Sequence, residues 1–139
     1  MKDQELVIHT DGGSRGNPGP AACGFVVEEG DRVLHMGSLY LGRATNNHAE
    51  YSGVMIALKW LEEQKELLKR KIVFYLDSEL IVRQINGIYK VKEANLQKLY
   101  KEIIHSIKEL DIDVYFKNVP RERNKIADSL VNEALDKNA

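Results

Sequence analysis

The sequence of 139 residues has one cysteine, three prolines and no excess of charge of either sign. Cys23 has no partner within the chain, so an internal disulfide is excluded and a cytoplasmic protein is expected. Lys and Arg number 20 and Asp and Glu number 21, which gives a net charge of -1. Proteins that hold nucleic acid mainly by neutralising phosphates carry a basic excess, so the composition disfavours that mode of binding.

Long apolar runs are absent as well, and none approaches the roughly 18 residues of a membrane span. The first residues run directly into a strand-like segment, which predicts no signal peptide. Hydrophobic residues make up 43% of the chain and charged residues 29%, without repeats, low-complexity tracts or linkers. We therefore expect a single globular domain over residues 1–139.

Hydrophobic periodicity predicts strands that alternate with helices in the second half of the chain. The expected strands are residues 5–10, 21–29, 32–41, 72–76 and 113–117. The expected helices are residues 49–69, 78–85, 95–110 and 126–135. A connection is expected at 41–47. Three strands in succession followed by this alternation predict an α/β fold with a mixed sheet packed by helices.

Four carboxylates are predicted to lie at junctions between these elements. Asp11 ends the first strand, Glu50 opens the first helix, Asp77 ends the buried strand and Asp128 lies in the first turn of the last helix. Each residue alone has a structural interpretation. These are a turn at Asp11, a capping box of Asn47 with Glu50, a helix cap at Asp77 and a helix-dipole partner at Asp128.

Together the four carboxylates favour a different role. The carboxyl ends of strands in α/β sheets form a ligand crevice, and acids at helix starts can face it. Such a cluster repels itself and drives at least one carboxyl towards protonation unless divalent cations neutralise it. Oxygen ligands favour Mg²⁺ or Mn²⁺ over Zn²⁺, and two such ions about 3.5–4 Å apart suit phosphodiester chemistry. The residues alone leave open whether the four acids converge.

The histidines offer no alternative metal site. His9, His35 and His105 lie in different predicted elements without ligand spacing, and His48 is expected at the surface where a helix begins. The sequence also has no phosphate-binding glycine loop and no Ser-His-Asp arrangement.

Four segments carry a resemblance to a known family: HTDGGSRGNPG (9–19), TNNHAE (45–50), LDSE (76–79) and NKIAD (124–128). In this order they resemble the type 1 ribonuclease H family over essentially the whole chain, in its compact form without a basic protrusion or a hybrid-binding domain. The resemblance implies a ribonuclease H-like fold. Its mixed five-stranded sheet has a three-stranded antiparallel meander, two parallel strands and helices on both faces. It also implies an endonuclease that hydrolyses the RNA strand of RNA/DNA hybrids and leaves 5′-phosphate and 3′-hydroxyl ends.

The resemblance also implies roles for individual residues. Asp11, Glu50, Asp77 and Asp128 correspond to the catalytic carboxylates that bind two Mg²⁺ ions, with Mn²⁺ as a substitute. The residues that match substrate-binding positions are Gly12, Gly13, Asn17, Arg43, Thr45, Asn46, Asn47, Glu79 and Tyr89. RNA would be distinguished from DNA by its 2′-hydroxyl and by the shape of the hybrid. We expect a monomer without a protein partner.

Three departures from the family pattern concern the substrate and proton handling. The loop 119–123 lacks the histidine that the family often has. Either Asn118, Arg121 or Arg123 takes over proton handling or product release, or turnover differs from that of the family. Residues 88–92 replace a Lys/Arg-rich protrusion, which predicts weaker and more salt-sensitive hybrid binding. Glu93 lies where an asparagine often helps to hold a DNA phosphate, and its charge would repel that phosphate.

Two other functions remain open at this point. A catalytically inactive binding module with this fold would typically have lost one of the carboxylates, and all four are present. A metal-dependent nuclease for duplex RNA or RNA–DNA junctions is the nearer alternative, because the departures affect the substrate contacts rather than the carboxylates.

Overall fold

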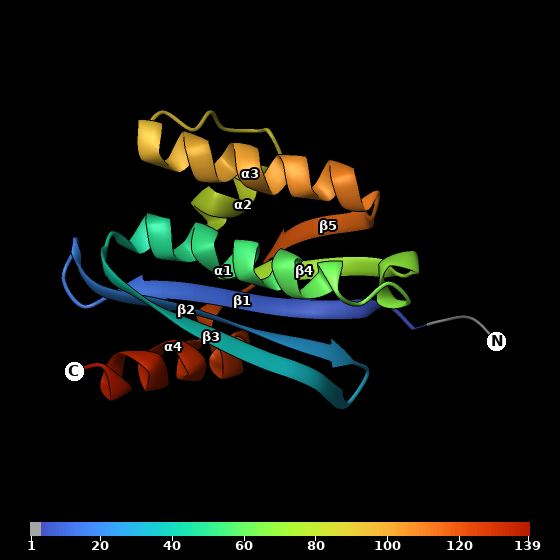
Figure 1. Ribbon diagram of the computed structural model, residues 1–139, viewed down its shortest axis with the longest axis horizontal. Helices are drawn as coiled ribbons and strands as arrows, with labels where there is room; N and C mark the ends of the chain where they lie inside the picture. Colours follow the sequence, from blue (N-terminus) through green and yellow to red (C-terminus); the bar gives the residue numbers. More distant parts are fainter. Residues whose placement is uncertain (1–3) are drawn as a thin grey trace.

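One mixed sheet with the strand order β3-β2-β1-β4-β5 runs through the computed structural model, which describes residues 4–139 (Figure 1). β1 (Leu6–Ser14), β2 (Gly19–Glu29) and β3 (Arg32–Ala44) form an antiparallel meander. β4 (Lys71–Leu76) pairs with β1 and β5 (Asp113–Asn118) pairs with β4, both in parallel. The predicted mixed five-stranded sheet is confirmed. Residues 1–3, where the chain was expected to start without a signal peptide, lie outside the described part.

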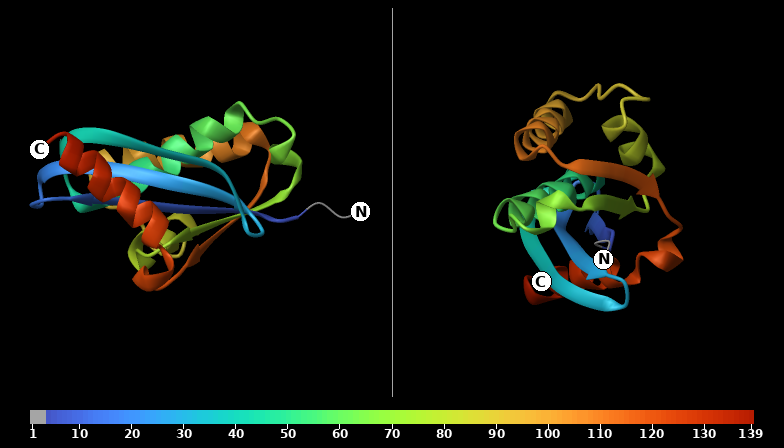
Figure 2. Two further views of the ribbon diagram at one scale, coloured as in Figure 1. Left: turned by 90° about the horizontal axis from the view of Figure 1, so that it is seen from below. Right: turned by 90° about the vertical axis from the view of Figure 1, so that its right-hand side faces the viewer.

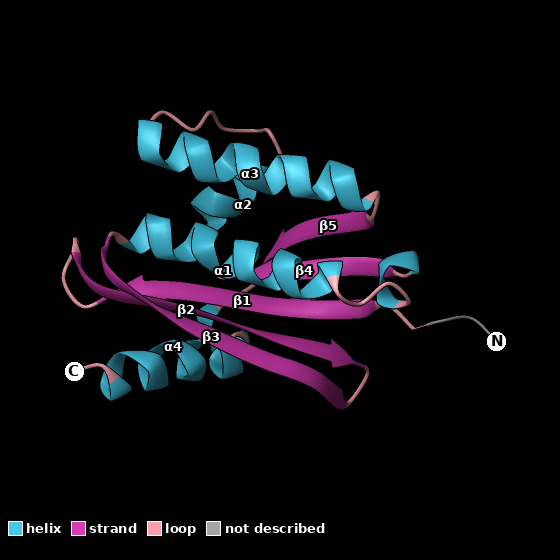
Figure 3. Cartoon of the chain, viewed as in Figure 1, coloured by secondary structure: helices cyan, strands magenta, loops and turns pink. Residues whose placement is uncertain are grey.

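Helices cover both faces of the sheet, as expected (Figures 1 and 2). α1 (Asn46–Glu62) packs on β1 and β2, with α3 (Ala94–Leu110) beside it, while α4 (Lys125–Lys137) covers the opposite face. α2 (Glu79–Ile85) lies against β4 and β5. Single 3-10 turns lie at Leu67–Lys69 and Arg121–Arg123 (Figure 3). None of the helices described could span a membrane, given their length and apolar content.

The main apolar core lies between the sheet and the α1 and α3 layer. Leu6, Ile8 and Phe74 from the sheet are fully buried against Tyr51 and Leu58 from α1. A smaller cluster on the other face packs residues of α4, among them Val131, against β2. Side chains alternate between the two faces of a strand, so His9 lies on the side opposite Ile8.

The first strand is longer than predicted, and the interpretation of Asp11 as its last residue is wrong. β1 continues through Gly12 and Gly13 to Ser14, because β2 pairs with it up to the pair Ser14 and Ala21. The glycines that suggested a turn therefore lie inside a strand. β3 likewise extends to Ala44, which shortens the predicted connection to a single residue before α1.

The first helix ends earlier than predicted, at Glu62 instead of residue 69. Residues 62–66 are all polar, so a continued helix would have no apolar face to bury. The chain turns instead, and Leu67 and Leu68 reach back to the main core before β4 begins. The boundaries of the three later helices differ from the predictions by at most two residues.

Candidate active site

The parallel pairing of β1 with β4 sets Asp11 beside Asp77. His9 and Tyr75 are the last paired residues, and the same register continued by two residues brings Asp11 opposite Asp77. Asp77 follows the end of β4 but does not cap α2, since the Ser78 hydroxyl accepts the hydrogen bond from the Ile81 amide at 3.3 Å. The helix-cap interpretation of Asp77 is therefore wrong, and its carboxylate is not occupied by a structural role at the helix start.

A close contact between α1 and β1 brings Glu50 to the same place. A Cβ atom on Gly12 would lie 2.1 Å from the Ala49 carbonyl oxygen, and one on Gly53 would lie 2.8 Å from the Asp11 carbonyl oxygen. Only glycine at both positions allows the helix to approach the strand this closely. Glu50, in the second turn of α1, thereby comes next to Asp11.

The start of α1 also differs from the prediction. The helix begins at Asn46, so Glu50 does not open it. Thr45 caps the helix by accepting a hydrogen bond from the His48 amide at 3.2 Å. The capping box of Asn47 with Glu50 is therefore wrong, and the Glu50 carboxylate needs another explanation.

Three of the four predicted acids form a tight cluster. Ligand oxygens of Asp11, Glu50 and Asp77 all lie within 4.8 Å of one another. Burial, followed by the charge of Asp77, raises the pKa of Asp11 from 3.8 to about 7. Burial and then the charge of Asp11 raise the pKa of Glu50 well above its ordinary value. The predicted push towards protonation is confirmed in direction, with burial as a larger cause than repulsion.

The donor set of this cluster fits a hard divalent cation. The side chains of Asp11 and Glu50 are only 6% and 8% exposed, and Glu50 Oε2 has no hydrogen-bond partner among the described residues. A buried carboxylate oxygen without a donor is costly unless a cation or a proton satisfies it. The cluster contains oxygen ligands alone, which Mg²⁺ and Mn²⁺ prefer over the softer ions that thiolates and imidazoles select.

Asp128 lies in the first turn of α4, as predicted, but outside the tight cluster. It lines a cleft of about 360 Å³ together with Asp11 and Glu50, and its charge is a smaller cause of the raised pKa of Asp11. We call this the carboxylate cleft. Its other lining residues include Gly12, Gly13, Asn46, Asn47 and Arg121.

Asparagine side chains tie the loop after β1 to the start of α1 at the edge of this cleft. Asn17 Oδ1 accepts a hydrogen bond from the Asn46 amide at 2.9 Å. Asn46 Oδ1 accepts two more, from the Ser14 amide at 2.9 Å and the Ser14 hydroxyl at 3.1 Å. These hydrogen bonds hold Asn17 and Asn46 in place through their Oδ1 atoms and do not use their side-chain NH₂ groups.

Arg43 and Thr45 lie in a neighbouring groove of about 570 Å³, which we call the outer groove. It is also lined by His48, Glu93 and Asn95. Glu93 was predicted from the sequence, whereas Asn95, whose amide lies in the same groove two positions further on, was not. The local pattern at Asn95 indicates only the start of a helix.

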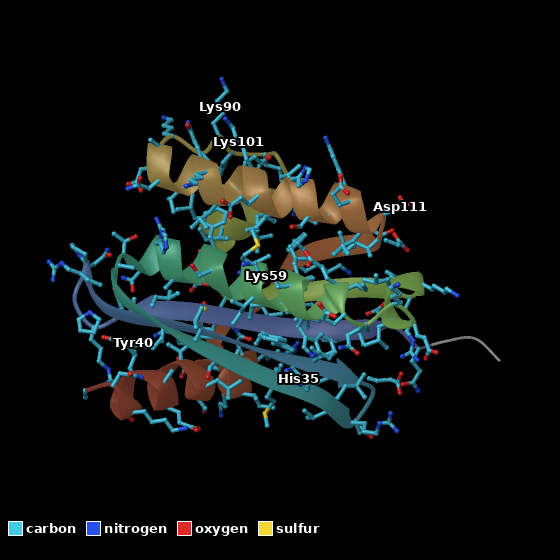
Figure 4. The ribbon with its side chains drawn as sticks, viewed as in Figure 1. His35, Tyr40, Lys59, Lys90, Lys101 and Asp111 are labelled. Carbon is cyan, nitrogen blue, oxygen red and sulfur yellow. The ribbon has the colours of Figure 1, made fainter. Side chains whose placement is uncertain are left out.

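The remaining predicted substrate residues are exposed. Tyr89 lines a groove of about 560 Å³ with Asn47 and Leu80. Glu79 is paired with Arg83 at 3.0 Å along α2. Lys90, in the connection between α2 and α3, lies on the outer side of the molecule, as does Lys101 of α3 (Figure 4). Residues 86–93 form no helix, in agreement with the predicted lack of a protrusion.

The three candidates for proton handling lie in different places. Arg121 lines the carboxylate cleft. Asn118 donates from Nδ2 to the Leu76 carbonyl at 3.0 Å, and Arg123 lines a separate pocket with His9 and Glu28. His35 stacks on Trp60 towards the other end of α1, with ring centroids 4.8 Å apart (Figure 4). Of the three candidates only Arg121 lines the carboxylate cleft, whereas Asn118 contacts the backbone of the residue before Asp77.

Asn124 is a second residue near the acids whose role was not predicted from the sequence. It opens the NKIAD segment (124–128), but its position before a helix indicates no contact with the acids. Its side chain is 1% exposed, and Nδ2 donates to the Thr10 carbonyl at 2.9 Å and to Asp77 Oδ2 at 3.2 Å. Asn124 therefore joins β1, the end of β4 and the start of α4 beside the acids.

Comparison with known proteins agrees with this arrangement. A family model described as reverse transcriptase-like matches residues 9–134. The bifunctional protein Rv2228c of Mycobacterium tuberculosis is 41% identical over 134 residues, which cover 95% of this chain and 36% of that protein. Ribonuclease HI of Halobacterium salinarum is 39% identical over 127 residues, which cover 91% of this chain and 62% of that protein. The chain thus spans about a third of the first relative and less than two thirds of the second.

A solved structure shows the same fold at higher identity. LC11-RNase H1, isolated from compost by a metagenomic approach and solved in complex with an RNA/DNA hybrid, is 45% identical with a TM-score of 0.89. The match covers 95% of this chain and 97% of that chain. Fold and acidic cleft together define a reverse transcriptase-like domain with a carboxylate metal site. Within that class, the chain belongs to the type 1 ribonuclease H family.

Proposed function

We propose that this chain is an endoribonuclease that hydrolyses the RNA strand of RNA/DNA hybrids with two bound divalent ions. Mg²⁺ is the expected ion and Mn²⁺ a substitute, and the products carry 5′-phosphate and 3′-hydroxyl ends. The observation that carries this proposal is the convergence of Asp11, Glu50 and Asp77 in one cluster, with a Glu50 oxygen that has no partner among the described residues. The likeness to LC11-RNase H1, which was solved with such a hybrid, supports the choice of substrate.

The four acids would hold the ions, with Asp11 and Glu50 as buried ligands and Asp128 at the side of the cleft. Two bound ions supply charge stabilisation to the phosphate in an in-line displacement. The protein supplies the fixed positions of the carboxylates and excludes water from the buried side of the site. Arg15 and Arg121 line the same cleft, and Arg15 is paired with Asp136 at 2.7 Å. Arg121 would therefore be the cation that assists a scissile phosphate or its release.

Substrate recognition would use the residues around the two grooves. Gly12, Gly13, Asn46 and Asn47 line the carboxylate cleft, where backbone and amide groups can read the 2′-hydroxyl of RNA. Asn17 supports Asn46, and Glu79 lies at the start of the neighbouring helix.

The DNA strand would lie along the outer groove. Arg43, Thr45 and Asn95 offer hydrogen-bond donors to a DNA phosphate there, and Tyr89 offers a ring for a sugar. We also propose that the chain works in the cytoplasm, which the single buried Cys23 supports, because free thiols persist in a reducing compartment. We propose further that it works as a monomer.

The test is cleavage of one end-labelled RNA strand, presented alone, as duplex RNA and as RNA/DNA hybrid, with Mg²⁺, Mn²⁺ or EDTA. We expect cutting of the hybrid alone, abolished by EDTA, with 5′-phosphate on the product. Equal cutting of duplex RNA would contradict the proposed specificity. No cutting with either ion would contradict the proposed activity and favour a binding module.

A further inference from the structure

A series of side chains in contact leads from Glu28 of β2 to the acids. His9 Nδ1 lies 3.1 Å from Asn124 Oδ1, and His9 Nε2 lies 3.6 Å from Glu28 Oε1. Asn124 in turn contacts Asp77 Oδ2 at 3.2 Å. The order is therefore Glu28, His9, Asn124 and Asp77, contributed by β2, β1, the start of α4 and the end of β4.

The Thr10 carbonyl fixes the directions of the hydrogen bonds that Asn124 makes with His9 and Asp77. Asn124 Nδ2 donates to the Thr10 carbonyl, which can only accept, so Oδ1 of the same amide is the acceptor that faces His9. His9 Nδ1 must then carry a proton and donate it in the hydrogen bond to Asn124. If the Asn124 amide were flipped, Oδ1 would face the Thr10 carbonyl and the Asp77 carboxylate, both acceptors.

His9 is held in this orientation by packing, and Glu28 lies beside its other ring nitrogen. Its ring stacks on Tyr75 with centroids 5.2 Å apart and planes at 29°. His9, Glu28 and Asn124 line a pocket of about 220 Å³ on the α4 side of the sheet, separate from the carboxylate cleft. The ring thus has a stacking contact and a polar contact at each nitrogen.

We propose that His9 is a positioning residue for Asp77, acting through Asn124. Asp77 is half-buried at the end of a strand, and its carboxylate can rotate unless one oxygen is held. His9 fixes which way the Asn124 amide points, and the amide fixes Asp77 Oδ2. The inference rests on the proposed role of Asp77 as a metal ligand and goes beyond it, because His9 touches neither ion nor substrate.

Two substitutions separate this role from packing. His9→Phe keeps a ring on Tyr75 and removes the donor, whereas His9→Asn keeps a donor at the position of Nδ1 and removes the ring. Asn124→Ala removes the direct support. Mn²⁺ binding to the protein without nucleic acid, measured by loss of the free-ion EPR signal, reports on the site independently of cleavage.

We expect Asn124→Ala to weaken Mn²⁺ binding by about 10- to 100-fold, the range for groups that orient a metal ligand. His9→Phe acts one contact further away and should weaken it by about threefold to tenfold. His9→Asn should bind Mn²⁺ nearly as well as the unaltered protein, even where its melting temperature falls.

His105→Phe on the exposed side of α3, where His105 lies 3.9 Å from Glu109, is the matched control and should leave Mn²⁺ affinity unchanged. Unchanged affinity in His9→Phe, or equal losses in His9→Phe and His9→Asn, would overturn the inference, because either result makes His9 a packing residue. If the unaltered protein bound no Mn²⁺ at all, the proposed function would fail together with the inference about His9.

Discussion

The carboxylate cleft and the outer groove lie side by side, yet they are built in different ways. Asp11 and Asp77 are set by the register of a parallel strand pair, and Glu50 by a helix contact that only glycine permits. Arg43, Glu93 and Asn95 in the outer groove are exposed side chains at the ends of elements. Moving an acid therefore requires moving the backbone of the core, whereas the outer groove changes with single surface substitutions.

This difference matches the chemistry required at each place. A site that binds two metal ions tolerates little displacement of its ligands, because the distances between metal and ligand are fixed to within a few tenths of an ångström. Contacts to nucleic-acid phosphates are long-range and additive, so they tolerate variation in number and position. Two of the three departures from the family pattern accordingly fall in the outer groove and in residues 86–93. The third, in the loop 119–123, borders the carboxylate cleft at Arg121, and none falls on the four acids.

The largest effect is expected from Asp77→Asn. Hybrid cleavage should fall by at least about 10³-fold, equivalent to about 4 kcal/mol, because a metal ligand loses its charge. The fold should persist, and in EDTA the variant should be no less stable, because the repulsion on Asp11 and Glu50 falls. Cleavage rate and urea unfolding measure the two parts, with Asp31→Asn in the exposed β2–β3 turn as the matched control.

The next effect is a pH dependence of stability without metal. The pKa of Asp11 is about 7 in the folded protein and 3.8 ordinarily, so the folded state holds the proton over this interval. Stability must then fall as pH rises from about 4 to about 7, by at most about 1.4 kcal/mol per pH unit for this group. Saturating Mg²⁺, which binds the ionised acids, should oppose the fall at the upper end.

Urea unfolding in EDTA at pH 5, 6 and 8 measures this dependence. Asp11→Asn cannot take up the proton, so its stability should vary less over the same range. Parallel profiles for the unaltered protein and Asp11→Asn would show that Asp11 titrates normally and that the acids are not forced together.

A smaller effect is expected from Gly53→Ala, which tests the helix contact. Glycine to alanine inside a helix ordinarily stabilises by about 1 kcal/mol. Here the new Cβ would lie 2.8 Å from the Asp11 carbonyl, and we expect a net loss of about 1–3 kcal/mol together with reduced cleavage. Gly13→Ala, whose Cβ would have neighbours no nearer than 3.9 Å, is the control for stability. A more stable Gly53→Ala would refute the close contact.

The same contrast shows what could be predicted from the sequence. The four acids and the order of the elements follow from local patterns and from the family resemblance. The extension of β1 through Gly12 and Gly13 does not, because Gly12 is required by a helix that approaches from another part of the chain. The role of Asn124 was also inaccessible, since its partners Thr10 and Asp77 are 114 and 47 positions away.

The smallest effect is expected in the outer groove, from Glu93→Gln. The carboxylate shares this groove with Arg43, and removing its charge lowers the repulsion of a nearby DNA phosphate. Exposed charges contribute about 0.2–1 kcal/mol, so hybrid affinity should rise by about twofold to fivefold at low salt. The gain should shrink at high salt, because exposed charges are screened within a Debye length of about 10 Å at 0.1 M.

Fluorescence anisotropy with labelled hybrid in Ca²⁺ or EDTA, at two salt concentrations, measures this change without cleavage. Glu109→Gln near the other end of α3 is the control for a general loss of negative charge. An equal gain in both variants would mean that net charge alone limits hybrid binding. A gain confined to Glu93→Gln would place the DNA strand in the outer groove, where Asn95 and Arg43 can hold its phosphate and where a single exposed carboxylate sets the affinity.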